Sequence, residues 1–309
     1  MTAALVPAAR QLSVLAPAFG LHTALISRVT LRVPPLGDLY LEDAIGAAAA
    51  LWLAPRCVPP LAALSSPASE PSLPRLSRRR LAFLLAALGA RYLLSGCIKQ
   101  GAGWLLAAAT PRLAAPRAWA LATLAGHLAW VGMAVRLLGD ELGFFAPRSA
   151  WLRLDWSASW LRWVLCGAAA CVPAFELASS LAPSPELGLG ALASAAPTIT
   201  AQITSLDDGL AFALSVFTAC ASGPFLEEVL YRGFLLRALR QHMPLGLAAP
   251  ASAALFALHH GTGPGQPTLP LAALGLVFSA TFVGSGNLAV SILTHSLWNL
   301  RVVALSRLR

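Results

Sequence analysis

Long apolar runs, separated by short polar, proline-rich or arginine-rich joints, constrain this chain more than any other feature of its sequence. Charged residues make up only 11% of its 309 residues, whereas soluble domains carry about 25%. A soluble fold of this size would lack the polar residues needed to cover its surface. A helix needs about 20 mostly apolar residues to cross a bilayer, so the sequence predicts an all-α fold, a polytopic transmembrane helical bundle of about eight helices. Strands are not expected, because the backbone N–H and C=O groups at the edge of an open sheet would have no hydrogen-bond partners in lipid.

The predicted membrane segments fall into two regions. In the N-terminal region, 38–204, membrane helices are expected at 38–55, 81–98, 118–138 and 163–182. In the C-terminal region, 205–309, spans or partial spans are expected at 209–222, 225–240, 245–260, 269–284 and 288–305. The joints between these segments, 65–80, 139–162 and 183–208, are more polar.

The net charge of +9 comes largely from arginines that flank the apolar segments. This placement indicates anchoring and orientation in a membrane, and the densest cluster, at 75–80, is predicted to face the cytosol or its organellar equivalent. Binding of nucleic acid is not expected, because the chain has no basic stripe with interleaved aromatic residues. The partners expected from composition are therefore membrane lipids.

The first 37 residues form a separate leader that contains three arginines and no acidic residue. An acid-poor, arginine-bearing leader is typical of an organelle transit peptide rather than of a secretory signal. The alternative is a poorly ordered or interfacial N-terminus.

Two adjacent acids, Glu227 and Glu228, lie within the apolar C-terminal region and are the last acids of the chain. A charged group inside a span costs about 2.5–3.5 kcal/mol on insertion scales, so such residues tend to face a cavity and to pair. On a helix, Glu228 and Arg232 are four residues apart and can form an ion pair. Glu227 points about 100° away from Glu228, which leaves its carboxylate available as a general base. The alternative is two acids that only cap or pair at a helix end.

Two further polar groups lie on separate apolar segments. Phe256 and His260 share one helix face, and His259 lies about 100° round the same helix. His295 and Asn299 are four residues apart in the last apolar segment, where the amide is a plausible oxyanion donor. Each group alone has a structural alternative, such as a helix–helix hydrogen bond. Because all of them need partners inside the membrane, we expect them to meet around one wet cavity and to activate water there.

The motifs EExxxR, FxxxH and HxxxN, in this order on hydrophobic segments, resemble the CPBP family of intramembrane proteases. This family includes the CAAX prenyl endopeptidases and the bacteriocin-processing or lysostaphin-resistance proteins. The resemblance covers about residues 205–305. The tract Leu-Thr-His-Ser-Leu-Trp-Asn is similar to plant and cyanobacterial members, which would suit a chloroplast membrane.

The resemblance implies a role for each matching residue. Glu227 would activate water, and Glu228 and Arg232 would hold the segment. His260, spaced from Phe256 as in the family, and His295 would be the two histidines, and Asn299 would stabilise the oxyanion. A divalent metal such as zinc stays open, with Glu227, His260 and His295 as three ligands and water as the fourth.

The function expected from these residues is an intramembrane, glutamate-dependent endopeptidase of the CAAX-processing type. Its substrate would be a prenylated or otherwise membrane-embedded C-terminal peptide. One alternative is a non-proteolytic membrane scaffold of the same fold, in which the polar cluster serves packing. Another is a transporter that uses the intramembrane acids as an ion relay.

Overall fold

The computed structural model describes residues 30–33, 37–40, 74–110, 113–143, 160–181, 199–260 and 268–308. Most of the leader and of the predicted span 38–55 lie outside these residues. The joints 65–80, 139–162 and 183–208 are described only in part. The two strands that the structure does describe, β1 (Thr30–Val33) and β2 (Gly37–Tyr40), pair antiparallel upstream of the apolar helices.

The membrane part is all-helical, as the apolar runs predict. With Gly209–Arg240 counted as one helix, the described residues form eight helices. They are α4 (Arg78–Ala109), α5 (Ala115–Leu142), α6 (Trp160–Leu181), α7 (Ile199–Thr204), the Gly209–Arg240 helix, α11 (Leu245–His259), α12 (Thr268–Ser285) and α13 (Leu288–Leu308). Six of them are long and apolar enough to cross a membrane, so the chain is a multi-pass membrane protein.

The Gly209–Arg240 helix corrects one prediction, because the expected segments 209–222 and 225–240 form one continuous helix. Its parts are α8 (Gly209–Phe217), the π-helical η3 (Thr218–Ser222), α9 (Gly223–Glu228), the π-helical η4 (Val229–Leu236) and α10 (Arg237–Arg240). Gly223 and Pro224, which lie between the two expected segments, are the first residues of α9. The π turns on both sides of α9 accommodate them, and π segments inside helices are frequent at functional sites.

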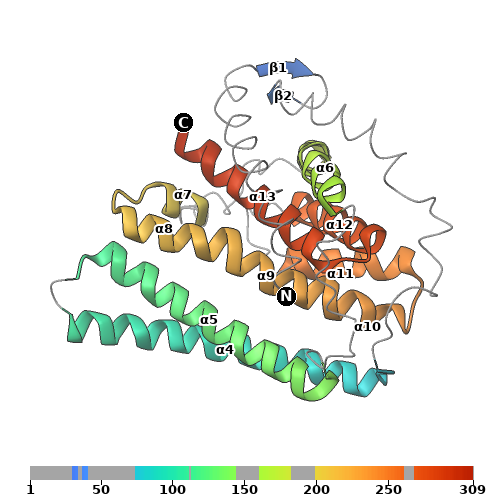
Figure 1. Ribbon diagram of the computed structural model, residues 1–309, viewed down its shortest axis with the longest axis horizontal. Coiled ribbons are helices and arrows are strands. Elements are labelled where there is room, and N and C mark those ends of the chain that lie inside the picture. Colours follow the sequence, from blue (N-terminus) through green and yellow to red (C-terminus); the bar gives the residue numbers. More distant parts are fainter. Residues whose placement is uncertain are drawn as a thin grey trace, which may run out of the picture.

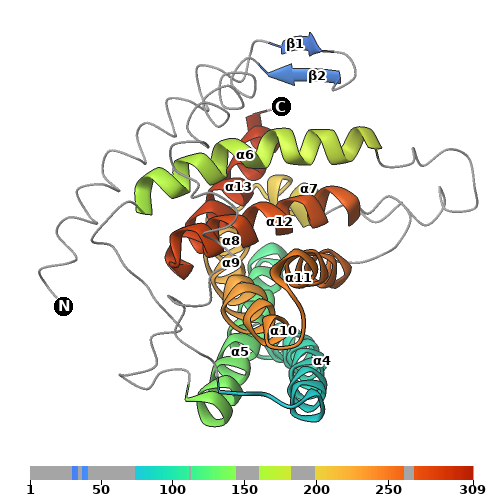
Figure 2. The same ribbon diagram turned by 90° about the vertical axis from the view of Figure 1, so that its right-hand side faces the viewer.

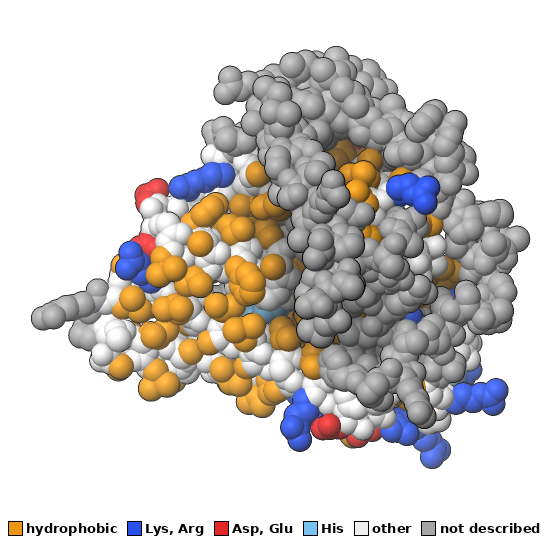
Figure 3. All heavy atoms as spheres, in the orientation of Figure 1, with side chains coloured by type: hydrophobic (Ala, Val, Ile, Leu, Met, Phe, Trp, Pro, Cys, Tyr) orange, Lys and Arg blue, Asp and Glu red, His pale blue; other side chains and the backbone are white. Residues whose placement is uncertain are grey.

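The helices lie in layers (Figures 1 and 2). The α4–α5 hairpin packs against the Gly209–Arg240 helix through α8 and η3, and α11 packs on η4 and α12. On the far side α6 covers α12 and α13. Hydrophobic side chains gather on the outer face formed largely by α4, α5 and α8, and the charged side chains in this view lie towards its margins (Figure 3). Such a surface suits contact with lipid.

The two ends of the bundle differ in charge. At one end Gln241 joins the start of α4, because its side-chain oxygen accepts a hydrogen bond from the Leu76 N–H (2.8 Å) and its amide donates to the Pro74 carbonyl (3.1 Å). The arginine cluster of 75–80 therefore lies beside Arg240. At the other end Asp208 caps α8 by accepting from the Ala211 N–H (2.9 Å) and pairs with Arg117 (2.7 Å). The Ala211 N–H, together with Arg117, holds the pKa of Asp208 below its usual value.

Candidate active site

Glu228 is the centre of a fully buried polar network. One carboxylate oxygen, Oε1, accepts from Arg232 Nη1 (2.9 Å) and from His295 Nδ1 (2.9 Å), and the other accepts from the Ser291 hydroxyl (2.6 Å). This confirms the predicted pair of Glu228 with Arg232. The network joins α9 and η4 to α13, and it leaves Glu228 and Arg232 with no exposed side-chain surface.

Arg232 extends the same network to α12. Its Nη2 donates to the Gly275 carbonyl (2.7 Å), and the rings of Phe256 and Phe278 lie 4.9 and 5.3 Å from its guanidinium carbon. A buried ion pair is stable only when additional hydrogen bonds satisfy its remaining atoms. Ser291, His295 and Gly275 satisfy most of these atoms, and Arg232 Nε has no hydrogen-bond partner among the described residues. Through these bonds the pair holds three helices in register.

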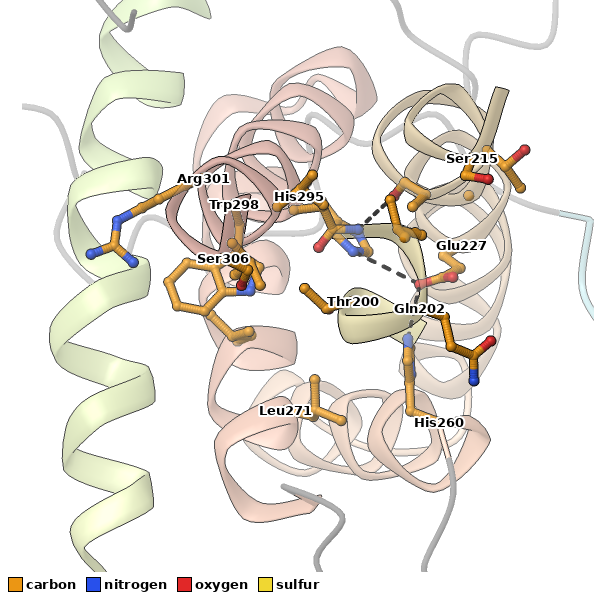
Figure 4. Close-up of a pocket in the computed structure, with 18 of the residues that line it drawn as sticks. Thr200, Gln202, Ser215, Glu227, His260, Leu271, His295, Trp298, Arg301 and Ser306 are labelled. Atoms are coloured by element: carbon orange, nitrogen blue, oxygen red, sulfur yellow. Dashed lines mark hydrogen bonds and ion pairs between the residues drawn. The ribbon is translucent and has the colours of Figure 1, made fainter. Parts of the chain in front are cut away.

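Glu227 points into a different environment from its neighbour. Its Oε2 lies 3.6 Å from His260 Nε2 and 3.9 Å from His295 Nε2, and only 15% of its side chain is exposed. This buried oxygen has no hydrogen-bond partner among the described residues. Figure 4 shows the two imidazoles approaching Glu227 from the end of α11 and from α13. The structure therefore brings Glu227, His260 and His295 together around one small space.

Hydrogen bonds on the far side of each imidazole determine which nitrogen faces Glu227. Nδ1 of His260 lies 2.9 Å from the Phe256 carbonyl, and Nδ1 of His295 lies 2.9 Å from Glu228 Oε1. A carbonyl and an ionised carboxylate only accept, so each Nδ1 carries a proton. Both Nε2 atoms are thus left to exchange a proton or a hydrogen bond with a group in the cavity.

The structure shows which of the two adjacent histidines, His259 or His260, faces the cavity. His260, the C-cap residue of α11, lines the cavity. The ring of His259 turns away and packs among Tyr92, Trp130 and Tyr231, with centroid distances of 5.1, 5.3 and 6.1 Å. His259 therefore ties α11 to the α4–α5 hairpin and is not a cavity residue.

Asn299 also lines the cavity, but its amide has a structural partner that the sequence did not reveal. In η3 the Gly223 N–H bonds to the Thr218 carbonyl, and the next donor in that register would be residue 224. Pro224 has no N–H, and Asn299 Nδ2 donates to the Ala219 carbonyl (2.8 Å) in its place. The second N–H of the amide remains for a ligand in the cavity.

The cavity that these residues share has a volume of about 640 Å³, within the range of ligand-binding sites. Glu227, His260, His295 and Asn299 line it, as predicted from their common need for partners, and so does Phe256. The sequence analysis missed Ser291, although Ser291, His295 and Asn299 recur every four residues on one face of α13. It also missed the N-terminal hairpin, from which Lys99, Trp119, Thr123 and His127 line the same cavity.

The residues present do not form a ready metal site. Among the described residues, no group of three His, Cys, Asp or Glu side chains has the geometry to hold a metal ion. His260 and His295 approach Glu227, with Nε2 to Oε2 distances of 3.6 and 3.9 Å. These three side chains nevertheless do not form such a group.

Residues 209–301 match the family model of the type II CAAX prenyl endopeptidases, described as Rce1-like. The match includes every candidate site residue from Glu227 to Asn299. This part of the chain is therefore similar to the Rce1-like domain of the CPBP proteases, a family of membrane proteases. No curated protein and no solved structure matches the chain.

Proposed function

We propose that the protein is an intramembrane endopeptidase that uses a water activated by Glu227 to cleave a membrane-embedded or prenylated peptide. The observation that carries the proposal is the buried, unpartnered Oε2 of Glu227, which faces two imidazole Nε2 atoms in a cavity between membrane helices. The match of residues 209–301 to a protease family supports it. The catalytic membrane domain is residues 205–309, and side chains of α4, α5, α6 and α7 complete the lining of the cavity.

The proposed reaction begins when Glu227 takes a proton from a water molecule held between its Oε2 and the imidazoles. The water oxygen attacks the carbonyl carbon of the scissile peptide bond, and a tetrahedral oxyanion forms. The free N–H of Asn299 donates a hydrogen bond to this oxyanion. His295, whose Nδ1 is held by Glu228 Oε1 and whose Nε2 faces Glu227 Oε2, orients the Glu227 carboxylate and the water. His260 and Glu227 then return the proton to the leaving amine, and the peptide bond breaks.

The test is a cleavage assay on a library of membrane peptides, with the purified protein in lipid vesicles. Wild type is compared with Glu227→Gln and with the matched control Glu141→Gln, whose carboxylate lies at the end of α5 beside Arg80. We expect Glu227→Gln to lower cleavage by about 10²–10⁴-fold and the control to retain it. Full cleavage by Glu227→Gln would contradict the mechanism.

Two additional experiments, with a chelator and with a knockout, distinguish this mechanism from a metal-dependent protease and from a non-proteolytic scaffold. A chelator is expected to leave cleavage intact, because the carboxylate and two imidazoles suffice to activate water. Loss of activity that zinc restores would instead assign Glu227, His260 and His295 as ligands. If Glu227→Gln and His260→Ala restore the biological role of a knockout, the protein acts as a scaffold.

We propose that the protein lies in a chloroplast membrane. The test is whether a fluorescent protein fused to residues 1–37 is targeted to chloroplasts.

A further inference from the structure

Three buried polar atoms on α5 and α8, Thr123 Oγ1, His127 Nε2 and Ser215 Oγ, have no hydrogen-bond partner among the described residues. All three side chains line the cavity that contains Glu227. A buried polar group without a partner lowers the stability of the fold, and buried waters typically bond to groups that would otherwise be unsatisfied. The three atoms therefore need a partner, and water in the cavity can be that partner.

The helix register places these three side chains in one file. The helices α5 and α8 run side by side in the same direction (Figure 1), and the ion pair of Arg117 with Asp208 (2.7 Å) fixes their register at one end. Thr123 and Ser215 lie six and seven residues beyond this pair, so they are at about the same level on neighbouring helices. His127 follows Thr123 by one turn on the same face of α5, which places it deeper in the bundle.

The cavity extends to the Asp208 end of the bundle. Trp119, near the start of α5, and Ser306, near the end of α13, line it there together with residues of α7. Lys99 of α4 lines the same part, and its ammonium lies 5.8 Å from the centre of the Trp119 ring. Ionisable groups inside membrane helices face the bundle interior or a water-filled cavity. This end of the cavity therefore has the polar lining that water requires.

The opposite end of the cavity is closed by apolar packing. Beyond Glu227 its helix adds no described residue to the cavity lining, and beyond His127 the same holds for α5. The side chains that follow, such as Val229, Phe234 and Leu138, are buried in the hydrophobic core that joins these helices to α4. Apolar side chains offer water no hydrogen bonds, so the polar path to Glu227 begins at the Asp208 end.

We propose that Thr123, His127 and Ser215 bind a file of water molecules that leads from the Asp208 end to Glu227 and supplies the water consumed in hydrolysis. The use of this water rests on the proposed function, whereas the file itself does not. Each cleavage consumes one water, because its hydroxyl group goes to the new carboxyl group and its proton to the new amine. The file replaces this water from the side of the membrane opposite the 75–80 cluster.

The test measures the reaction of introduced cysteines with a small membrane-impermeant thiosulfonate, using the full chain in vesicles and peptide mass spectrometry. With the reagent on the Asp208 side, we expect Thr123→Cys and Ser215→Cys to react at least about tenfold faster than Ala122→Cys, because the reactive thiolate forms in water and not in apolar surroundings. Ala122 is the matched control, a buried neighbour on α5 outside the cavity lining. Asp207→Cys and His242→Cys report the side that the reagent reaches.

The file is overturned if Thr123→Cys reacts no faster than Ala122→Cys, or if it reacts only from the side of the 75–80 cluster. These reactions need no cleavage, so they separate the file from the proposed function. If Glu227→Gln cleaves at the wild-type rate while Thr123→Cys and Ser215→Cys react as expected, the proposed mechanism fails and the file stands.

Thermal unfolding of Thr123→Val gives a second measurement that does not depend on labelling. If the hydroxyl of Thr123 is bonded to water, the substitution removes those hydrogen bonds and the unfolding temperature falls. In a dry site the substitution would instead remove an unsatisfied buried group, and the unfolding temperature would rise. An unchanged or higher unfolding temperature for Thr123→Val therefore counts against the bound water.

Discussion

At the residue scale, the adjacent glutamates of α9 have different environments because their directions differ by about 100°. Glu228 faces Arg232, Ser291 and His295 and is fully enclosed by them. Glu227 faces the cavity, where two imidazoles approach it without forming a hydrogen bond. One carboxylate therefore stabilises the helix arrangement, and the other remains available for chemistry.

The two adjacent histidines also have different roles, because His260 faces the cavity and His259 packs among aromatic rings. His260→Ala removes a cavity imidazole and is expected to lower kcat by about 10²–10⁴-fold. His259→Phe preserves an aromatic ring among Tyr92, Trp130 and Tyr231 and is expected to retain most of the activity. Steady-state cleavage in vesicles measures both. The assignment of the doubled histidine is wrong if His259→Phe, and not His260→Ala, abolishes cleavage.

At the element scale, Pro224 and Asn299 should be energetically coupled. Asn299→Ala leaves the Ala219 carbonyl unsatisfied and is expected to cost about 1–3 kcal/mol of unfolding free energy. In a Pro224→Ala background the restored N–H replaces the amide, so the cost should be smaller. A double-mutant cycle on unfolding measures this coupling. Pro224→Ala should not restore the cleavage lost in Asn299→Ala, because the oxyanion donor is still missing. Equal costs in both backgrounds would refute the coupling.

The contact between α11 and α12 also depends on one small residue. A Cβ atom at Gly275 would lie 2.9 Å from the Cβ and 3.0 Å from the Cα of Ala253. We expect Gly275→Ala to push the helices apart, lengthen the contact of Arg232 with the Gly275 carbonyl and destabilise the fold by about 1–3 kcal/mol. Gly89→Ala on α4 is the control, since nothing lies within 4 Å of a Cβ there. Equal unfolding temperatures for the two variants would count against this packing.

The described elements also show what a sequence can reveal. The apolar runs predicted most helices, because membrane spans need long apolar segments, and the polar residues inside them indicated the cavity. The π turns were not predicted, because hydropathy does not distinguish an α turn from a π turn. Ser291 was missed for another reason: it acts through Glu228, which is distant in sequence, and no local motif marks it.

At the scale of the whole molecule, the arginine-rich end and the Asp208 end should lie on opposite sides of the membrane. The Gly209–Arg240 helix has 32 residues, or about 48 Å, which exceeds the thickness of the hydrocarbon core. A membrane-impermeant maleimide should label His242→Cys from the side of the 75–80 cluster and Asp207→Cys from the other, relative to wild type. Labelling of both from one side would rule out this arrangement.

The central claim is that Glu227 activates water while Glu228 holds the fold. The most direct measurement determines kcat/KM and the unfolding free energy of Glu227→Gln and Glu228→Gln in the same bilayer, beside wild type. We predict that Glu227→Gln keeps the wild-type stability and loses cleavage, whereas Glu228→Gln, which leaves Arg232 buried without its counter-charge, loses about 3–5 kcal/mol. A stable Glu227→Gln protein that cleaves at the wild-type rate would contradict the account.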